Sequence, residues 1–264
     1  ITNCVVSNSM YRGIYVDKAN NTNYTNYQTA YFAHTQVLGT GGQGAKTANI
    51  GYAAIDINAT GAYFENTLVE NSTTVGVRLY LVDYTTTFKN LTIRNSGDPG
   101  QGAHEAGLAI SSSFFAPLFD TLEITGSVGP GIHASAGGSM TGSDWILENN
   151  TGDGLFIDSS TIYTFGIDTA YNGQSGVHVY DSRYVVLGDV NSSFDGQLGL
   201  TNSEKAGIYF EKSNDIESNS GDVMCAGCYV YNSSGSGVLV ENSVDLYLSQ
   251  MFIYDASPEY PALS

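Results

Sequence analysis

Basic residues are scarce in this sequence of 264 residues. Nine lysines and arginines stand against 26 aspartates and glutamates, which gives a formal net charge of −17. A nucleic-acid-binding protein needs a basic face for its phosphate contacts, so we expect no nucleic-acid partner. Binding to an anionic membrane surface is disfavoured for the same reason. Low lysine content with a negative net charge is typical of secreted and saline-water proteins.

Cysteines and long apolar runs are also lacking. The three cysteines, Cys4, Cys225 and Cys228, are too few for a disulfide scaffold. No run of about 18 apolar residues exists, so no membrane insertion is expected. No signal peptide precedes the first residues, "ITNCVVSNS", which begin without Met in the middle of a pattern. We therefore expect residues 1–264 to be a single domain that forms a segment of a longer protein.

Asparagine, serine and threonine are abundant, and they form N-x-S/T sequons, the acceptors of N-glycosylation. These sequons favour an extracellular or cell-surface location. The asparagines concerned are Asn20, Asn23, Asn58, Asn71, Asn90, Asn149, Asn191 and Asn232.

A repeat runs through nearly the whole chain. Aligned on the glycine of "GVHV" (176–179), the same frame returns with uninterrupted spacings of 22 to 24 residues. The position after this anchor is always a branched aliphatic residue, and the position two further on is also apolar. Such alternation predicts a strand with one buried face. The anchors are Gly13, Ala54, Gly76, Gly107, Gly131, Gly154, Gly176, Gly207 and Gly237.

Two further apolar columns precede each anchor. Asn8, Asn71, Asn149 and Asn232 stand five residues before their glycines and predict a bend, because asparagine tolerates left-handed backbone. Stacked asparagines could also bond one another as a ladder. Two residues before the bend lie Val6, Val37, Val69, Ile93, Ile124, Leu147, Ala170 and Val230. Seven residues before it lie Phe32, Phe64, Phe88, Phe119 and Phe165.

Three short strands in about 22 residues predict an all-β fold, a right-handed parallel β-helix of nine to ten coils. Each coil buries its inner face only by stacking on the next at roughly 4.8 Å, which gives a rod of about 43 Å for nine coils. A β-sandwich or a β-propeller would use antiparallel strands and would not produce three inward columns at this period. The coil pattern resembles the pectate-lyase-like β-helix superfamily, without pointing to a specific member.

Insertions interrupt the period at 40–50, 97–105 and 198–206, each before an anchor. They should emerge along one edge of a sheet and could wall a groove of the kind in which enzymes of this superfamily bind polysaccharide. The alternative is that any solenoid loop tolerates insertion. Two more insertions, near 19–28 and 214–222, follow the anchor strand.

The outward positions of the anchor strand carry the chemistry. Aromatic, acidic and imidazole side chains alternate there, a combination that stacks on sugar rings and bonds sugar hydroxyls. We predict substrate binding by Arg78, Tyr80, His133, Phe156 and Tyr209, and catalysis by Asp158, His178, Tyr180 and Glu211.

Two mechanisms are open for these catalytic candidates. Asp158 and Glu211 share a column two coils apart, about 9.6 Å, at the upper edge for an inverting carboxylate pair. Alternatively, His178 as base and Tyr180 as acid could carry out β-elimination on a uronic acid. Lyases of this kind need a cation to neutralise the sugar carboxylate, and Arg78 lies about 19 Å from His178 by strand spacing. No cofactor is expected, with calcium as the alternative cation.

Family signatures are missing from the sequence. It lacks the paired-aspartate and Gly-His-Gly motifs of polygalacturonases, the Asp-Pro-His motif of alginate epimerases, and an evident calcium-binding cluster of pectate lyases. Our main hypothesis is therefore an adhesive or structural module with a carbohydrate-binding face, whose partners are a glycan and neighbouring domains of the parent chain. The alternative hypothesis is a polysaccharide lyase or glycoside hydrolase.

The remaining motifs have plainer interpretations. "CAGC" (225–228) has the spacing of a metal or redox pair, but both cysteines fall in inward columns, so we expect buried apolar thiols. His34 and His104 are interpreted as surface histidines, although His104 could lean into the groove from its insertion.

Overall fold

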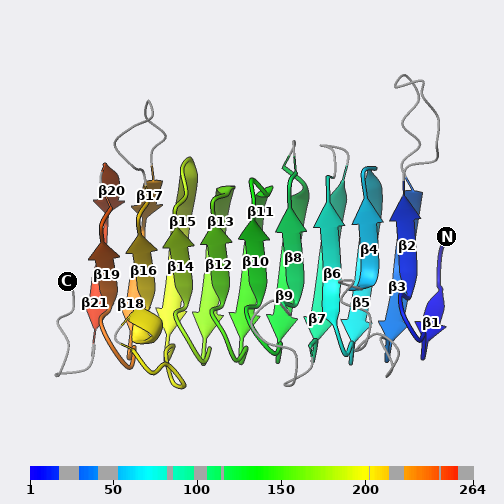
Figure 1. The fold of residues 1–264 in the computed structure, drawn as a ribbon, viewed down its shortest axis with the longest axis horizontal. Helices are drawn as coiled ribbons and strands as arrows, with labels where there is room; N and C mark the ends of the chain where they lie inside the picture. Colours follow the sequence, from blue (N-terminus) through cyan, green and yellow to red (C-terminus); the bar gives the residue numbers. More distant parts are fainter. Residues whose placement is uncertain are drawn as a thin grey trace.

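The computed structural model describes residues 1–17, 30–40, 53–81, 86–97, 106–113, 116–201, 203–213, 223–243 and 245–254. Figure 1 shows a rod in which the strands stack side by side from one end to the other. Every strand pairing is parallel, which excludes the sandwich and the propeller. The right-handed parallel β-helix predicted from the repeat is confirmed. None of the helices in the described residues is long and apolar enough to cross a membrane.

One sheet, here called the anchor sheet, contains the strand that follows each anchor residue. Its nine strands pair with one another in chain order along the rod. They are β2 (Ile14–Asp17), β4 (Ala53–Asn58), β6 (Val75–Tyr80), β8 (Leu108–Ser111), β10 (Ile132–Ser135), β12 (Leu155–Asp158), β14 (Val177–Tyr180), β16 (Ile208–Glu211) and β19 (Val238–Glu241).

The second sheet, here called the long-strand sheet, joins the other two predicted strands of each coil. In most coils they form one strand that bends at a residue with positive φ, such as Asn66 or Asp189. Its members are β1 (Val5–Ser7), β3 (Ala30–Leu38), β5 (Ala62–Glu70), β7 (Thr87–Arg94), β9 (Leu118–Thr125), β11 (Ser139–Glu148), β13 (Thr161–Ala170), β15 (Val185–Ser193), β17 (Val223–Ala226), β18 (Tyr229–Tyr231), β20 (Leu246–Ser249) and β21 (Phe252–Tyr254).

The predicted inward columns form the core. Phe64, Phe88 and Phe119 are fully buried and stack face to face, with ring centroids 4.8 and 5.0 Å apart. Asn8, Asn71, Asn149 and Asn232 all have φ between 52° and 56°, so the left-handed bend is confirmed. The Asn95 amide also donates to Asn71 at 3.2 Å, which confirms one step of the predicted asparagine ladder.

The prediction for Phe165 and Ala170 is wrong by one position. The bend of this coil is at Tyr171, not at the following Asn172. Thr164 and Thr169 therefore take the inward positions, while Phe165 is 41% exposed. The cause is that Asn172 points inward, where its amide donates to Asp195 and accepts from Asn150.

The prediction for the cysteines is half correct. Cys225 and Cys228 are both fully buried, but they form a disulfide and are not free thiols. The left-handed Gly227 between them turns the chain so that the two side chains meet, with the Cα atoms 6.2 Å apart. That separation lies within the usual span of a disulfide. Cys4 is the free cysteine of the described residues.

Candidate functional site

A hollow of about 490 Å³, here called the central hollow, opens on the anchor sheet over β12, β14 and β16. Its floor is formed by the outward side chains of these strands, namely Phe156, His178, Tyr209 and Glu211. Its rim is formed by the turns that lead into neighbouring strands, through residues that include Pro130, Asp153 and Gln174. A third element, the 198–206 insertion, adds Thr201 and Glu204.

A row of stacked rings crosses the floor. Parallel in-register pairing places His133, Phe156, His178 and Tyr209 in successive coils at one position. The centroids of successive rings are 5.0, 4.8 and 4.4 Å apart, which follows the spacing of neighbouring strands. Because neighbouring rings pack face against face along the row, the hollow is lined by ring edges, and Tyr209 is only 4% exposed.

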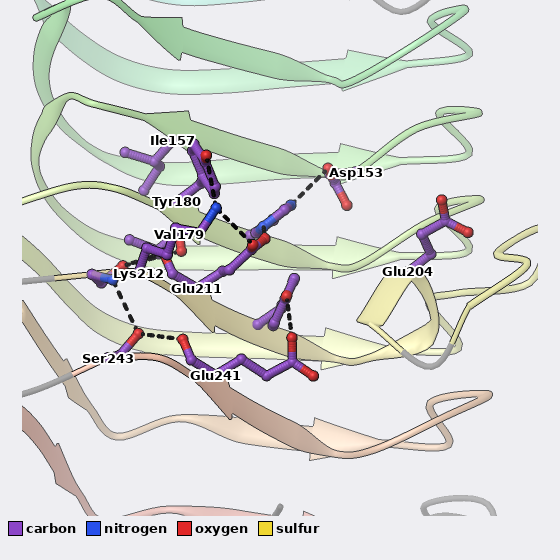
Figure 2. A network of polar contacts seen from close by, with 12 residues as sticks. Asp153, Ile157, Val179, Tyr180, Glu204, Glu211, Lys212, Glu241 and Ser243 are labelled. Carbon is purple, nitrogen blue, oxygen red and sulfur yellow. Dashed lines mark hydrogen bonds and ion pairs between the residues drawn. The ribbon is translucent and has the colours of Figure 1, made fainter.

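His178 lies between two carboxylates. Its Nδ1 is 3.6 Å from the Asp153 Oδ2, and its Nε2 is 3.7 Å from the Glu211 Oε2. Figure 2 labels the two carboxylates. Asp153 lies on the turn before β12, and Glu211 lies at the end of β16. Both separations exceed hydrogen-bond length, and Nε2 is buried without a hydrogen-bond partner among the described residues.

Tyr209 connects the floor to a further carboxylate. Its hydroxyl donates to the Glu241 Oε2 at 2.8 Å, across the pairing of β16 with β19. Burial raises the pKa of the Tyr209 phenol far above its usual value, and hydrogen bonding to Glu241 and Glu211 raises it further. The phenol therefore keeps its proton over the working range of pH and can donate it as a hydrogen bond.

The 198–206 insertion forms the wall that the sequence predicted. It contains the short 3₁₀-helix η1 (Ser203–Lys205). The Glu204 carboxylate accepts hydrogen bonds from the amides of Leu200 and Thr201, at 2.7 and 3.0 Å, which fixes the loop. The hydrogen bond from the Thr201 amide, and next the one from the Leu200 amide, lower the pKa of Glu204. Its carboxylate is therefore charged at the rim.

The other insertions fall almost wholly outside the described residues. This holds for 19–28 and 214–222, and for 40–50 and 97–105 beyond Thr40 and Gly97. His104 lies in that part of the chain. His34 is described, and it occupies the left-handed bend of β3, on the long-strand sheet.

The predicted catalytic residues are only partly brought together. His178 and Glu211 line the central hollow, but Asp158 and Tyr180 do not. The predicted column of Asp158, Tyr180 and Glu211 is present in the strand register. Asp158 accepts a hydrogen bond from Ser159 at 2.9 Å, and the Tyr180 hydroxyl accepts one from Lys212 at 3.2 Å.

The predicted substrate-binding residues divide into two groups. Phe156 and Tyr209 line the central hollow, and His133 begins the ring row beside it. Arg78 and Tyr80 lie elsewhere, in a separate hollow on β4 and β6.

Sequence reasoning missed Asp153, Gln174 and Glu204. Asp153 and Gln174 lie one and two residues before the anchors Gly154 and Gly176, in turns that we treated as connections. The available signal was a polar residue close to an anchor, at the edge from which groove walls were expected. The described residues contain no group of three or more His, Cys, Asp or Glu side chains that could hold a metal ion.

Comparison with known proteins finds a likeness in fold. No family model matches the sequence, and no curated protein matches it. Among solved structures, the A-module of the mannuronan C-5 epimerase AlgE4 from Azotobacter vinelandii superposes with a TM-score of 0.60. The match covers 99% of this chain and 76% of that chain, at 13% sequence identity. An identity this low shows the shared fold alone, a pectate-lyase-like β-helix.

Proposed function

We propose that this chain is a polysaccharide-cleaving enzyme whose active site is the central hollow, and that it acts by hydrolysis. The observation that carries the proposal is the placement of His178 between the carboxylates of Asp153 and Glu211, on an aromatic floor. The likeness to an epimerase that acts on a polysaccharide supports an enzyme over the binding module that the sequence favoured.

The spacing of the carboxylates is compatible with hydrolysis. Both approach nitrogens of one imidazole ring, so the two facing oxygens are at most about 9.5 Å apart, which is the upper limit for inverting pairs. One carboxyl group would protonate the glycosidic oxygen, and the other would activate a water molecule on the opposite face of the sugar. His178 lies between them and would position both, while Phe156 contacts the sugar from the floor of the hollow.

Charge favours hydrolysis over elimination. The charged groups that line the central hollow are Asp153, Glu204 and Glu211, with His178 as the titratable base. An anionic uronate bound between them would be repelled, whereas a neutral sugar would not. The second candidate is β-elimination, as in the sequence hypothesis, with His178 as base. The likeness to an epimerase of a uronate polymer favours it.

The test is incubation of the protein with pectin, alginate and a panel of neutral glycans, measuring reducing ends and unsaturated-uronate absorbance. We expect reducing ends without unsaturated products, and a loss of about 10²–10⁴-fold in Glu211→Gln and in Asp153→Asn. Glu123→Gln is the matched control, because Glu123 pairs with Arg94 on the long-strand sheet. Glycan retention without turnover would instead establish a binding module, and unsaturated products would establish a lyase.

The setting of this activity follows from the same reasoning. We propose an extracellular or cell-surface location and a polysaccharide as partner, with neighbouring domains of the parent chain as further partners. The sequons and the acidic composition support the location.

A further inference from the structure

A second hollow of about 330 Å³, here called the arginine hollow, lies on the anchor sheet far from the central hollow. The outward side chains of β2, β4 and β6, together with Arg12, form most of its lining. The residues that matter for its chemistry are Arg12, Tyr15, Asp56, Arg78 and Tyr80.

Two guanidinium groups meet on one buried carboxylate in this hollow. Asp56 is 1% exposed, and Arg78 binds it in bidentate fashion, at 3.0 Å through Nε and 2.7 Å through Nη2. Arg12 approaches the same carboxylate, with Nε 2.6 Å from Oδ2. One carboxylate balances one of the two positive charges. Two of the nine basic residues of a strongly acidic chain are therefore concentrated here.

Tyrosines flank the paired arginines. Tyr15 and Tyr80 are 46% and 42% exposed, and the Arg12 guanidinium lies 4.3 Å from the centroid of the Tyr15 ring. Exposed aromatic faces bind sugar rings, and the planar fork of arginine matches a carboxylate or a sulfate. Asp17, which accepts hydrogen bonds from Tyr15 and Asn58, adds a second negative charge nearby, so two arginines and two carboxylates balance and the hollow is locally neutral in a chain of net charge −17.

The two hollows are aligned along one column of the sheet. Arg78 pairs in register with Ala109, Ala109 with His133, His133 with Phe156, and Phe156 with His178. Four strand spacings separate Arg78 from His178, which is about 19 Å. The side chains between the hollows include the small Ala109 and Ser135, together with the ring of His133.

We infer that the arginine hollow binds an anionic sugar unit, one that carries a carboxylate or a sulfate, of the same glycan chain that the central hollow cuts. The inference rests on the proposed function only in joining the two hollows to one glycan. It makes the substrate an acidic heteropolysaccharide, with a neutral unit at His178 and an anionic unit four coils away.

The test is calorimetric titration of the full chain carrying Glu211→Gln, so that bound glycan is not turned over. The probes are hexamers of galacturonate, mannuronate and chondroitin sulfate, with cellohexaose as the neutral probe. We expect saturable, salt-sensitive binding of at least one acidic hexamer that exceeds binding of cellohexaose. Arg78→Lys should weaken that binding roughly tenfold, because the guanidinium N–H donors that do not bond Asp56 are lost while the charge remains.

Tyr80→Ala keeps the measurement informative if Arg78→Lys fails to fold, because it leaves both arginines on Asp56. Tyr80→Ala should also weaken binding of the acidic hexamer. The control is Tyr247→Ala, which removes an exposed aromatic ring on the long-strand sheet and should leave this binding unchanged. Unchanged affinity in both hollow variants, equal binding of the neutral hexamer, or no saturable binding of any acidic hexamer would overturn the inference. Failure of the proposed function is seen separately, as absence of turnover by the unmodified chain.

Discussion

The carboxylate of Asp195 lies in the space that the β-carbon of any larger residue would need at Gly176. A β-carbon built on Gly176 would contact the Asp195 Oδ2, together with the hydroxyl oxygens of Thr169 and Ser192. The two hydroxyls each donate to that Oδ2 at 2.8 Å, while the Asn172 backbone and side-chain amides donate to Oδ1 at 2.9 Å. The anchor at position 176 is therefore glycine because the buried polar network around Asp195 leaves no room for a β-carbon.

The first prediction is that Gly176→Ala destabilises the fold by about 1–3 kcal/mol, because an added methyl group must displace bonded oxygens in a packed interior. The measurement is the free energy of unfolding in urea. Ala54 occupies the equivalent anchor in another coil and is fully buried, so Ala54→Gly is the matched change in the opposite direction. Unfolding energies that do not differ between Gly176→Ala and the unmodified chain would contradict the network as the reason for glycine.

The second prediction concerns pH. Burial raises the pKa of Asp195 from 3.8 to about 6, despite four hydrogen bonds that favour the charged form. The native state therefore binds this proton more tightly than the unfolded chain. The resulting stabilisation, on the order of 2–3 kcal/mol, is complete below about pH 4 and is lost as pH rises through about 6.

Asp195→Asn, which imitates the neutral form and continues the column of Asn150 and Asn172, tests this. Its stability relative to the unmodified chain should be highest above pH 6 and should fall as the pH is lowered towards 4. Asp189→Asn, at an exposed bend of β15, the strand that ends just before Asp195, should show no such change. Thermal unfolding between pH 4 and 8 provides the comparison, and parallel curves for Asp195→Asn and the unmodified chain would refute the prediction.

The third prediction addresses the ring row. His178→Ala removes the imidazole between Asp153 and Glu211 and should abolish turnover, with a loss of about 10²-fold or more. His133→Ala removes a ring at the end of the row, outside the central hollow, and should raise KM more than it lowers kcat. Steady-state kinetics, measured on the glycan that the panel identifies as the substrate, separate the two effects. Equal losses in kcat for both variants would indicate a general packing defect.

The fourth prediction is that Tyr209→Phe changes catalysis without unfolding the protein. The ring stays on His178, but Glu241 and Glu211 lose the phenol that bonds them. We expect a lower kcat, with the melting temperature nearly unchanged. An unchanged kcat would show that the phenol has no part in catalysis.

The fifth prediction follows from the disulfide. Alkylation of the unfolded, unreduced protein should label Cys4 alone, whereas prior reduction should allow all three cysteines to react. Mass spectrometry distinguishes these outcomes. Labelling of Cys225 without reduction would show that the pair is not bonded.

The repeat made the coils, the anchor strand and the inward columns predictable, because each inward position must be apolar in every coil. The same logic failed at Asn172. Asparagine suits both a left-handed bend and a buried ladder, and the letter alone does not distinguish them. Tyr171 takes the bend instead, so the inward positions are occupied by Thr164 and Thr169 and not by the expected Phe165 and Ala170.

The candidate site was less predictable than the fold. His178, Phe156, Tyr209 and Glu211 could be found because they occupy outward positions of a regular strand. Glu204 could not, because insertions follow no period and its side chain reaches the site through loop geometry. Asp153 left only a weak signal, a polar residue one position before an anchor. The pairing of Cys225 with Cys228 was missed for a similar reason, since it depends on the bend at Gly227.

In-register pairing fixes the distance between Arg78 and His178 at a whole number of coils. If one hollow holds a charged sugar unit and the other cuts the glycan chain, the number of coils between them sets the length of the product. Removing one coil between the two hollows would then shorten the product in a discrete step, which ordinary point substitutions cannot do.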